Sequence, residues 1–307
     1  MQFEQKLNVF TNRCNMNVFL KNTISPYEEM LAYETLWGQQ NQTLKSLATL
    51  FKKNRVVPSH LLQAQSDFLK TSDLAPKVER HLSEKRGFSV SVHGDFSYPE
   101  RLQQAKYPVE LFYYKGDIGV LDSRCVSVVG SRKCSEEGKI RTQALVTKLV
   151  EHGLTIVSGL AVGVDTAALK TAIAKGGKVV GVIGTPIDEY YPRENRDLQD
   201  EIANKHLLVS QVPFYRYATE PFRSRRNYFP QRNETMSALS EATIIVEASD
   251  TSGTLTQARA CLEQRRKLFI LNSCFLRTDI SWPRKFEQKG AIRVNKIEDV
   301  LEPLNLR

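Results

Sequence analysis

The spacing of apolar residues divides the chain into a helical first part and a longer part in which strands and helices alternate. From about Ser25 to Leu82, apolar residues recur at helical spacing, and no strand-like alternation interrupts them. Pro26 after Ser25 is typical of a helix start, and Gly38 is typical of a helix end. Across Phe88–Val92 the side chains alternate with period two, which predicts a strand.

The remainder of the chain predicts a parallel sheet. After the apolar stretch Leu111–Tyr114, short apolar runs alternate with segments of helical spacing. Such runs are typical of strands buried on both faces by helices, which defines an α/β fold. We expect residues 1–87 to form an N-terminal extension and a small helical domain, and residues 88–307 to form the α/β domain. The strands are expected near Cys125–Val129, Leu154–Val157, Lys178–Ile183, Leu207–Val209, Thr243–Val246 and Lys267–Leu271.

Composition narrows the class of protein without deciding the function. The chain has 307 residues, and its 43 Lys and Arg against 34 Asp and Glu give a net charge of +9, which favours a polyanionic partner. No apolar run approaches the roughly 20 residues of a membrane-spanning helix. The five cysteines form no C-x-x-C pair, which favours a reducing compartment. We therefore expect a cytoplasmic protein that does not contact the membrane.

Two glycine-bearing loops carry the first candidate site. Each follows a predicted strand and precedes a predicted helix, where backbone N–H groups and a positive helix end are exposed to phosphate. As alternatives, the loops are ordinary tight turns, and the aspartate caps its helix or orients the nearby serine. Neither loop has the G-x-G-x-x-G spacing of a dinucleotide site, and no G-x-x-x-x-G-K-[ST] motif is present. The candidate residues are Gly130, Ser131 and Arg132 in the first loop and Ser158, Gly159 and Asp165 in the second.

Three further loops add positive charge and aromatic rings. The loop Gly184–Arg193 contains a glycine, two tyrosines and an arginine, and Glu247–Thr254 contains the pair Ser252-Gly253. The segment Phe222–Asn233 interleaves four arginines with three aromatic residues, and a helix is expected to begin near Gln231. Arginine binds phosphate and aromatic faces stack on bases, so this pattern favours single-stranded nucleic acid; a solvated basic loop is the alternative. The candidate residues are Arg193, Arg225, Arg226, Arg232, Asn233, Ser252 and Gly253.

The sequence contains no complete catalytic or metal-binding motif. Its five histidines are scattered without H-x-x-x-H spacing, and no G-x-S-x-G elbow is present. We therefore expect a binding protein without catalytic residues, metal or cofactor.

As a set, the loops resemble the DprA/Smf family of bacterial DNA-processing proteins. The matching runs stand in family order between about Phe88 and Leu301, and they include Val129-Gly130-Ser131-Arg132, Ser158-Gly159-Leu160-Ala161, Tyr191-Pro192-Arg193, Phe229-Pro230-x-Arg232-Asn233 and Ser252-Gly253-x-Leu255-Thr256. The resemblance implies an extended Rossmann-like parallel sheet of the DprA type, preceded by a helical domain. It also implies single-stranded DNA binding, a homodimer, and loading of a RecA-type recombinase during transformation or recombination.

The resemblance assigns roles to individual residues. It implies that Arg132 and Arg193 line the DNA pocket, that Arg232 and Asn233 form the family's Arg-Asn motif, and that Ser158, Gly159 and Asp165 belong to its second loop. Many members carry a C-terminal winged helix, which we do not expect in a chain that ends at Arg307. The sequence departs from the family pattern at four places. Leu169 stands where the family commonly has histidine, and Gln211 stands where it has glutamate. Glu234 replaces a second arginine, and Asn272-Ser273 replaces a Pro-Gly pair.

Two other functions stay open. Related nucleotide phosphoribohydrolases carry G-G-x-G-T-x-x-E, and the nearest run here is Ser252–Gln257. Gln257 stands where the catalytic glutamate is needed, and an amide cannot act as an ionised base. The other alternative is a nucleotide-binding sensor that uses the same loops for a small ligand.

Overall fold

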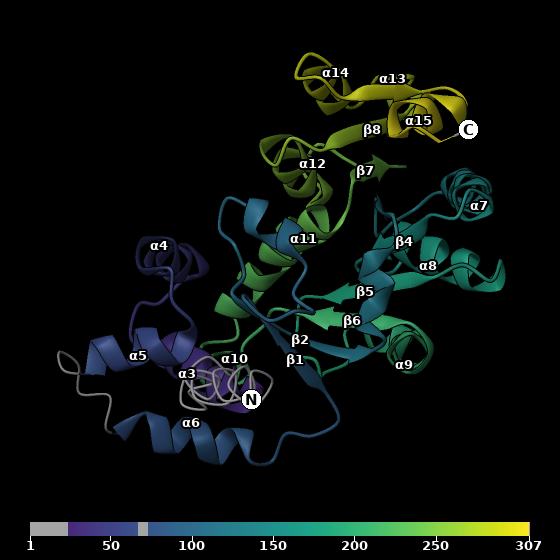
Figure 1. Ribbon diagram of the computed structural model, residues 1–307. Coiled ribbons are helices and arrows are strands. Elements are labelled where there is room, and N and C mark those ends of the chain that lie inside the picture. The colour runs from purple at the N-terminus through teal and green to yellow at the C-terminus, as the bar shows by residue number, and fades with distance from the viewer. Residues whose placement is uncertain (1–23, 67–72, 307) are drawn as a thin grey trace, which may run out of the picture.

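A computed structural model describes residues 24–66 and 73–306; the predicted N-terminal extension lies outside these ranges, so it stays a prediction. The segment expected to be helical contains helices that pack beside the sheet (Figure 1). Helix α4 begins with a capping box in which the side chain of Thr43 accepts from the backbone of Ser46, and Ser46 in turn accepts from Thr43. The helices are α3 (Pro26–Gly38), α4 (Leu44–Asn54), α5 (Pro58–Ser66) and α6 (Ala75–Leu82).

Nine strands of the described residues form one sheet in the order β1-β2-β6-β5-β4-β3-β7-β8-β9. Strands β3 to β9 run parallel, and β1 and β2 add an antiparallel edge. Every residue of β3 and β5 is buried, as their predominantly apolar sequences predict. The strands are β1 (Ser89–Val92), β2 (Leu111–Gly116), β3 (Cys125–Val129), β4 (Thr155–Ser158), β5 (Val179–Ile183), β6 (Leu207–Ser210), β7 (Ala242–Ile245), β8 (Lys267–Leu271) and β9 (Ile292–Val294).

Helices cover both faces of this sheet. Helices α7, α8 and α9 lie on one side, and α11 and α12 lie on the other (Figure 1). The α/β fold with a mostly parallel sheet is confirmed, and the six predicted parallel strands lie within one residue of their expected bounds. The α-helices are α7 (Glu136–Glu151), α8 (Val164–Ala174), α9 (Arg196–Lys205), α10 (Phe214–Thr219), α11 (Tyr228–Leu239), α12 (Thr254–Glu263), α13 (Asn272–Phe275), α14 (Trp282–Glu287) and α15 (Glu298–Leu301).

Short 3-10 helices complete the chain. They are η2 (Glu100–Gln104), η3 (Ile118–Asp122), η4 (Arg193–Asn195), η5 (Ser224–Asn227) and η6 (Glu302–Leu304). Among the described helices, none is both long and apolar enough to cross a membrane.

The chain order of the strands creates a switch point in the sheet. From β3 the chain adds β4, β5 and β6 on one side, and it then returns to place β7 on the other side of β3. The connections after β3 and β7 therefore leave the sheet at its carboxyl edge in opposite directions. Open α/β sheets bind ligands in the crevice that such a divergence creates.

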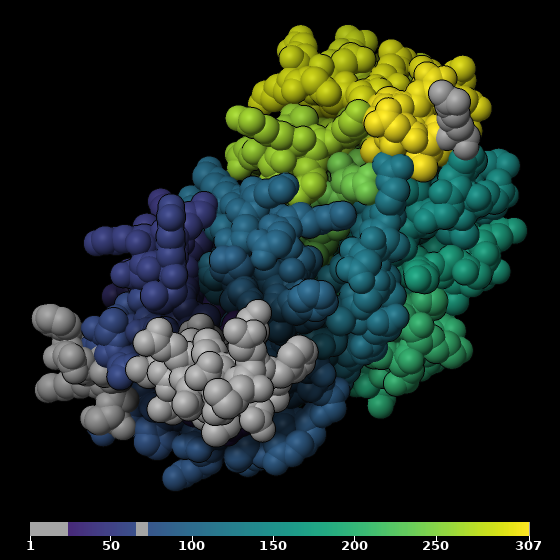
Figure 2. Space-filling view, viewed as in Figure 1, coloured from purple at the N-terminus to yellow at the C-terminus, as the bar shows by residue number. Residues whose placement is uncertain are grey.

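The N-terminal helices share a hydrophobic core with the sheet. Tyr33 and Trp37 of α3 belong to the same buried cluster as Val92 of β1 and Tyr113 of β2. In the space-filling view, the N-terminal helices (purple to blue) lie at the end of the molecule opposite the C-terminal elements (yellow) (Figure 2). The division at residues 87 and 88 stays a prediction about independent folding.

A buried carboxylate joins α3 to the sheet and to α10. Glu34 is fully buried and accepts hydrogen bonds from the Tyr113 hydroxyl and from the backbone N–H groups of Phe214 (2.7 Å) and Tyr215 (2.9 Å). These bonds favour the ionised form, but burial outweighs them and raises the pKa of Glu34 to about 7.

We predict that Glu34 makes the stability of the fold depend on pH. The pKa of Glu34 is higher in the folded state than in the unfolded chain. Its favourable contribution to the free energy of unfolding is therefore complete below about pH 4.5 and is lost as the pH rises to about 7. Over this window the free energy of unfolding of the wild type should fall by roughly 1–3 kcal/mol relative to Glu34→Gln. Urea unfolding of both proteins across the window measures this difference. Parallel stability curves would contradict the prediction.

Candidate site at the carboxyl edge of the sheet

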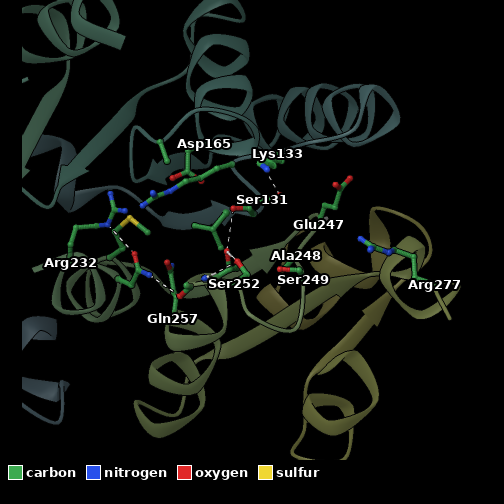
Figure 3. Close-up of a pocket in the computed structure, with 18 residues that line it drawn as sticks. Ser131, Lys133, Asp165, Arg232, Glu247, Ala248, Ser249, Ser252, Gln257 and Arg277 are labelled. Carbon is green, nitrogen blue, oxygen red and sulfur yellow. Dashed lines mark hydrogen bonds between the residues drawn. The ribbon is translucent and has the colours of Figure 1, made fainter. Parts of the chain in front are cut away.

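The loops that follow β3 and β7 enclose a cavity at the switch point of the sheet. Its volume is about 650 Å³, which lies within the usual range of small-molecule pockets. Figure 3 places Arg232 and Arg277 at opposite ends of this cavity, with Asp165 and Lys133 along one wall and Ser252 and Gln257 along the other. The lining comes from four segments of the chain: 129–133, 161–165, 232–236 and 247–257, together with Arg277.

Glycines allow these loops to approach one another closely. A Cβ atom at Gly130 would lie 2.6 Å from a methyl carbon of Val164 and 2.8 Å from the carbonyl oxygen of Glu247. At Gly163, φ is +86°, and a Cβ atom would clash with the carbonyl oxygen of Ser131. The backbone N–H of Ser131 donates to the Glu247 carbonyl (2.7 Å), so the β3 and β7 loops are also hydrogen-bonded to each other.

Asp165 is buried between the first two loops. It lies in the first turn of α8 and is 5% exposed. Burial raises the pKa of its carboxyl group, whereas the charge of Arg232 and the backbone N–H groups of Ala161, Gly159 and Gly130 act in the opposite direction. The side chain therefore organises both glycine loops from within.

Arg232 is equally buried and connects three strand ends. Its Nη1 donates to the carbonyl oxygens of Gly159, after β4, and Val182, in β5 (2.8 Å). Its Nε donates to the side chain of Asn233 (2.9 Å), whose amide donates to the carbonyl of Gly253 in the β7 loop (3.0 Å). Burial lowers the pKa of Arg232 to about 10, and the nearby charge of Asp165 opposes this effect.

The exposed cations of the cavity are different residues. Arg132, Lys133 and Arg277 all line it and are exposed. The guanidinium of Arg132 lies 5.7 Å from the ring centre of Phe229, and Arg277 is paired with Asp279 (2.5 Å). The sequence interpretation missed Lys133 and Arg277. Lys133 directly follows the Gly-Ser-Arg run, which could have identified it, but Arg277 follows β8 and belongs to no motif that we identified.

A second, smaller cavity of about 70 Å³ adjoins the first and contains aromatic rings. The rings of Tyr191 and Phe229 lie 5.2 Å apart between their centres. A Cβ atom at Gly184 would lie 2.7 Å from the Phe229 ring, so the third loop approaches α11 only because this residue is glycine. Arg132 and Arg232 line both cavities and so connect them.

Several candidate residues lie outside these two cavities. Ser158 is buried, and its hydroxyl donates to the Val128 carbonyl (2.7 Å). Arg193 and Arg226 are exposed and line neither cavity. Arg225 also lies outside them, and its guanidinium lies 4.5 Å from the ring centre of Tyr217. Of the four arginines in the fourth loop, only Arg232 reaches the cavities.

The fourth loop is also more helical than expected. Helix α11 begins at Tyr228 and not near Gln231, so this boundary was wrong by three residues. Pro230 lies in the first turn of this helix, where its missing N–H leaves no intrahelical bond unmade.

The departures from the family pattern lie outside both cavities. Leu169 is fully buried in the core, and Gln211 is 2% exposed with neither amide atom hydrogen-bonded. Glu234 is half-buried, and burial followed by the charge of Glu263 raises its pKa, while Lys106 opposes this shift. Its carboxylate therefore does not place negative charge in the lining of either cavity.

Gln257 lines the larger cavity at the position that a related hydrolase fills with glutamate. It is 1% exposed, and its amide nitrogen lies 3.4 Å from the hydroxyl of Thr243. Within residues 24–66 and 73–306, no group of three or more His, Cys, Asp or Glu is arranged to hold a metal ion.

The fold and the cavity define a Rossmann-like α/β protein with a cation-lined site at the sheet's switch point. A family model described as DNA recombination-mediator protein A matches residues 89–305, and the chain belongs to this family. The DNA processing protein DprA of Streptococcus pneumoniae is 37% identical over 207 residues, which are 67% of this chain and 71% of that protein. DprA of Bacillus subtilis is 33% identical over 232 residues, which are 75% of this chain and 76% of that protein.

Solved structures agree with this assignment. The X-ray structure of DprA from Streptococcus pneumoniae has a TM-score of 0.74 at 28% identity and covers 91% of this chain and 98% of its own. The structure of DNA processing protein A from Helicobacter pylori is described for its single-stranded DNA binding mode. It has a TM-score of 0.60 at 27% identity, and the match covers 71% of this chain and 95% of that protein.

We predict that Arg232 and Arg132 differ sharply in their effect on stability. Arg232→Ala removes the buried partner of Asp165 and two hydrogen bonds to carbonyls, so it should lower the free energy of unfolding by about 3 kcal/mol. Arg132→Ala changes an exposed side chain, so its free energy of unfolding should stay within about 0.5 kcal/mol of the wild-type value. Urea unfolding of the three proteins measures both values. Equal effects of the two substitutions would show that Arg232 does not hold the loops together.

Proposed function

We propose that the carboxyl edge of the sheet binds single-stranded DNA without sequence preference and without bond chemistry. The observation that carries this proposal is the convergence of Arg132, Lys133 and Arg277 on one cavity at the switch point. The Helicobacter pylori relative, described for single-stranded DNA binding, supports the same ligand for this chain. A backbone phosphate would lie in the larger cavity, close to these cations and to the loop at Ser252 and Gly253.

In this proposal, the bases contact the aromatic side of the site. Tyr191 is 46% exposed and lies beside Phe229, so a base can stack there while its phosphate stays near Arg132. Stacking of this kind accepts every base, which agrees with sequence-tolerant binding. Arg193, Arg225 and Arg226 would contact phosphates farther along the strand, outside the two cavities.

Asp165 and Arg232 have an indirect role in this proposal. Both are 5% exposed, and Arg232 already donates to carbonyl groups of the protein. They hold Gly130, Gly159 and Asn233 in the positions that form the walls of the cavity. Ser158 holds the loop that follows β4 against β3, because its hydroxyl donates to the carbonyl of Val128.

We predict that Arg132→Ala and Lys133→Ala each weaken binding of a labelled single-stranded oligonucleotide. Each lost phosphate contact should lower affinity roughly 3- to 10-fold and reduce the slope of log K against log salt by about 0.7. Fluorescence anisotropy at several salt concentrations measures both quantities. Arg80→Ala, which removes an exposed arginine on α6, is the matched control and should leave both unchanged. Wild-type binding by both cavity variants would refute the proposed site.

The hydrolase alternative makes a separate prediction. Because the amide of Gln257 cannot serve as a base, the protein should release no free base from nucleoside monophosphates. Chromatography of the reaction mixture measures the release, with an active phosphoribohydrolase as positive control. Base release that Gln257→Ala abolishes would favour the enzyme. Melting shifts produced by nucleotides but not by oligonucleotides would instead favour a nucleotide sensor.

We further propose that the protein acts in the cytoplasm as a homodimer and loads a RecA-type recombinase onto the bound strand. These expectations follow from the family resemblance and are separate from DNA binding. Sedimentation of the full chain tests the dimer. Recombinase filament assembly on oligonucleotide coated with single-strand binding protein, with and without this protein, tests loading.

A further inference from the structure

A second concave surface lies between α7 and the C-terminal elements. We name it the α7–β9 groove. Its volume is about 310 Å³, and it is distinct from both cavities of the DNA site. Residues of α7, β8, α13 and β9 line it together, at the end of the sheet that carries the C-terminal elements (Figure 1). The groove is lined by Arg141, Ala144, Leu145, Lys148, Leu271, Asn272, Ser273, Val294, Asn295, Lys296 and Ile297.

The floor of the groove is apolar. Leu145, Leu271 and Val294 are buried below it, and the exposed Ala144 continues the floor on α7. Ile140 lies one helical turn before Ala144, so it extends this apolar strip, and it is 64% exposed. Together, Ile140, Ala144 and the groove floor form a contiguous apolar surface, which is a feature of docking sites.

The rim of the groove is positively charged. Arg141, Lys148 and Lys296 line it, and no Asp or Glu is among the lining residues. Lys148 pairs with Glu151 (2.7 Å), but both side chains are about half exposed, so the pair is weak and exchangeable. The described ion pairs include none to Lys296.

Two hydrogen-bond donors in the groove have no partner among the described residues. They are the Nε atom of Arg141 and the hydroxyl of Ser273, and both atoms are buried. A buried donor without a partner is unfavourable, so an acceptor from a bound molecule would relieve this cost. Ser273 belongs to the Asn272-Ser273 pair that departs from the family pattern, and a Pro-Gly pair would supply no hydroxyl here.

We propose that the α7–β9 groove docks an acidic, amphipathic segment of a protein partner. Its apolar side chains would cover Leu145 and Val294, and its carboxylates would meet the three cations and the two unpartnered donors. A nucleic-acid strand fits less well, because it would leave the apolar floor and Ile140 uncovered. The groove holds a few side chains, so the occupant is a short segment anchored by them.

The groove is physically connected to the larger cavity. Arg141 reaches from the groove toward Glu247, with 3.7 Å between the guanidinium and carboxylate atoms. Glu247 lines the cavity and accepts from the hydroxyl of Ser135 (2.7 Å). A partner docked in the groove therefore lies beside the cavity without occupying it. The docking proposal does not depend on which ligand the cavity binds.

The experiment measures binding of a short, fluorescein-labelled helical peptide with leucines on one face and glutamates beside them. One control peptide replaces the glutamates with lysines, and another replaces the leucines with serines. The full-length protein should bind the first peptide more tightly than either control in fluorescence anisotropy. The double substitution Lys148→Glu with Lys296→Glu should weaken binding by about 3- to 10-fold or more. The same reversal at Lys285 of α14 and at Lys289, two residues after the end of that helix, should have no effect.

Further measurements distinguish docking in the groove from general charge attraction and from dimer formation. Both double variants should keep the melting temperature and the oligonucleotide affinity of the wild type. Ser273→Ala should weaken peptide binding, because it removes one donor, and it should not lower the melting temperature, because that donor has no partner in the unbound protein. Equal binding of the serine peptide would mean that charge alone attracts the peptide, which would overturn the proposal. So would a groove variant that converts a dimer into a monomer in sedimentation, because a second copy would then cover the groove.

Discussion

The candidate site depends on a guanidinium and a carboxylate buried together beneath the loops. Arg232 and Asp165 are each 5% exposed, and neither charge is stable in such a place without the polar groups around it. Arg232 satisfies two carbonyl oxygens after β4 and in β5, while backbone N–H groups surround Asp165. These interactions hold the glycine loops in one arrangement, so that Arg132 and Lys133 are free to face a ligand.

The sequence was sufficient to predict the α/β fold and most of the sheet. Strands such as Val179–Ile183 lack polar side chains throughout, which is typical of strands that helices bury on both faces. Strand β9 (Ile292–Val294) was missed because it has only three residues and an arginine at its centre. The antiparallel pairing of β2 with β6 was also not predicted, since an apolar run does not specify the direction of its neighbour.

The site was predictable to the level of loops but not of side chains. Carboxyl ends of parallel strands meet at one edge, which is why Gly130, Gly159 and Gly253 lie near one another. Side-chain direction depends on tertiary packing, and here it separates arginines that look equivalent in sequence. Arg232 turns inward toward Val182, whereas Arg225 stacks on Tyr217. Arg277 reaches the cavity from beyond β8, and no local pattern indicates this.

The return of the chain from β6 to β7 has a consequence for the order of events during synthesis. The two walls of the larger cavity come from segments far apart in sequence; Ser135 and Glu247, for example, are separated by 112 residues. A growing chain that has emerged only as far as β6 carries Arg132 and Lys133 but has no opposite wall. The larger cavity therefore closes only after the second half of the sheet has been synthesised.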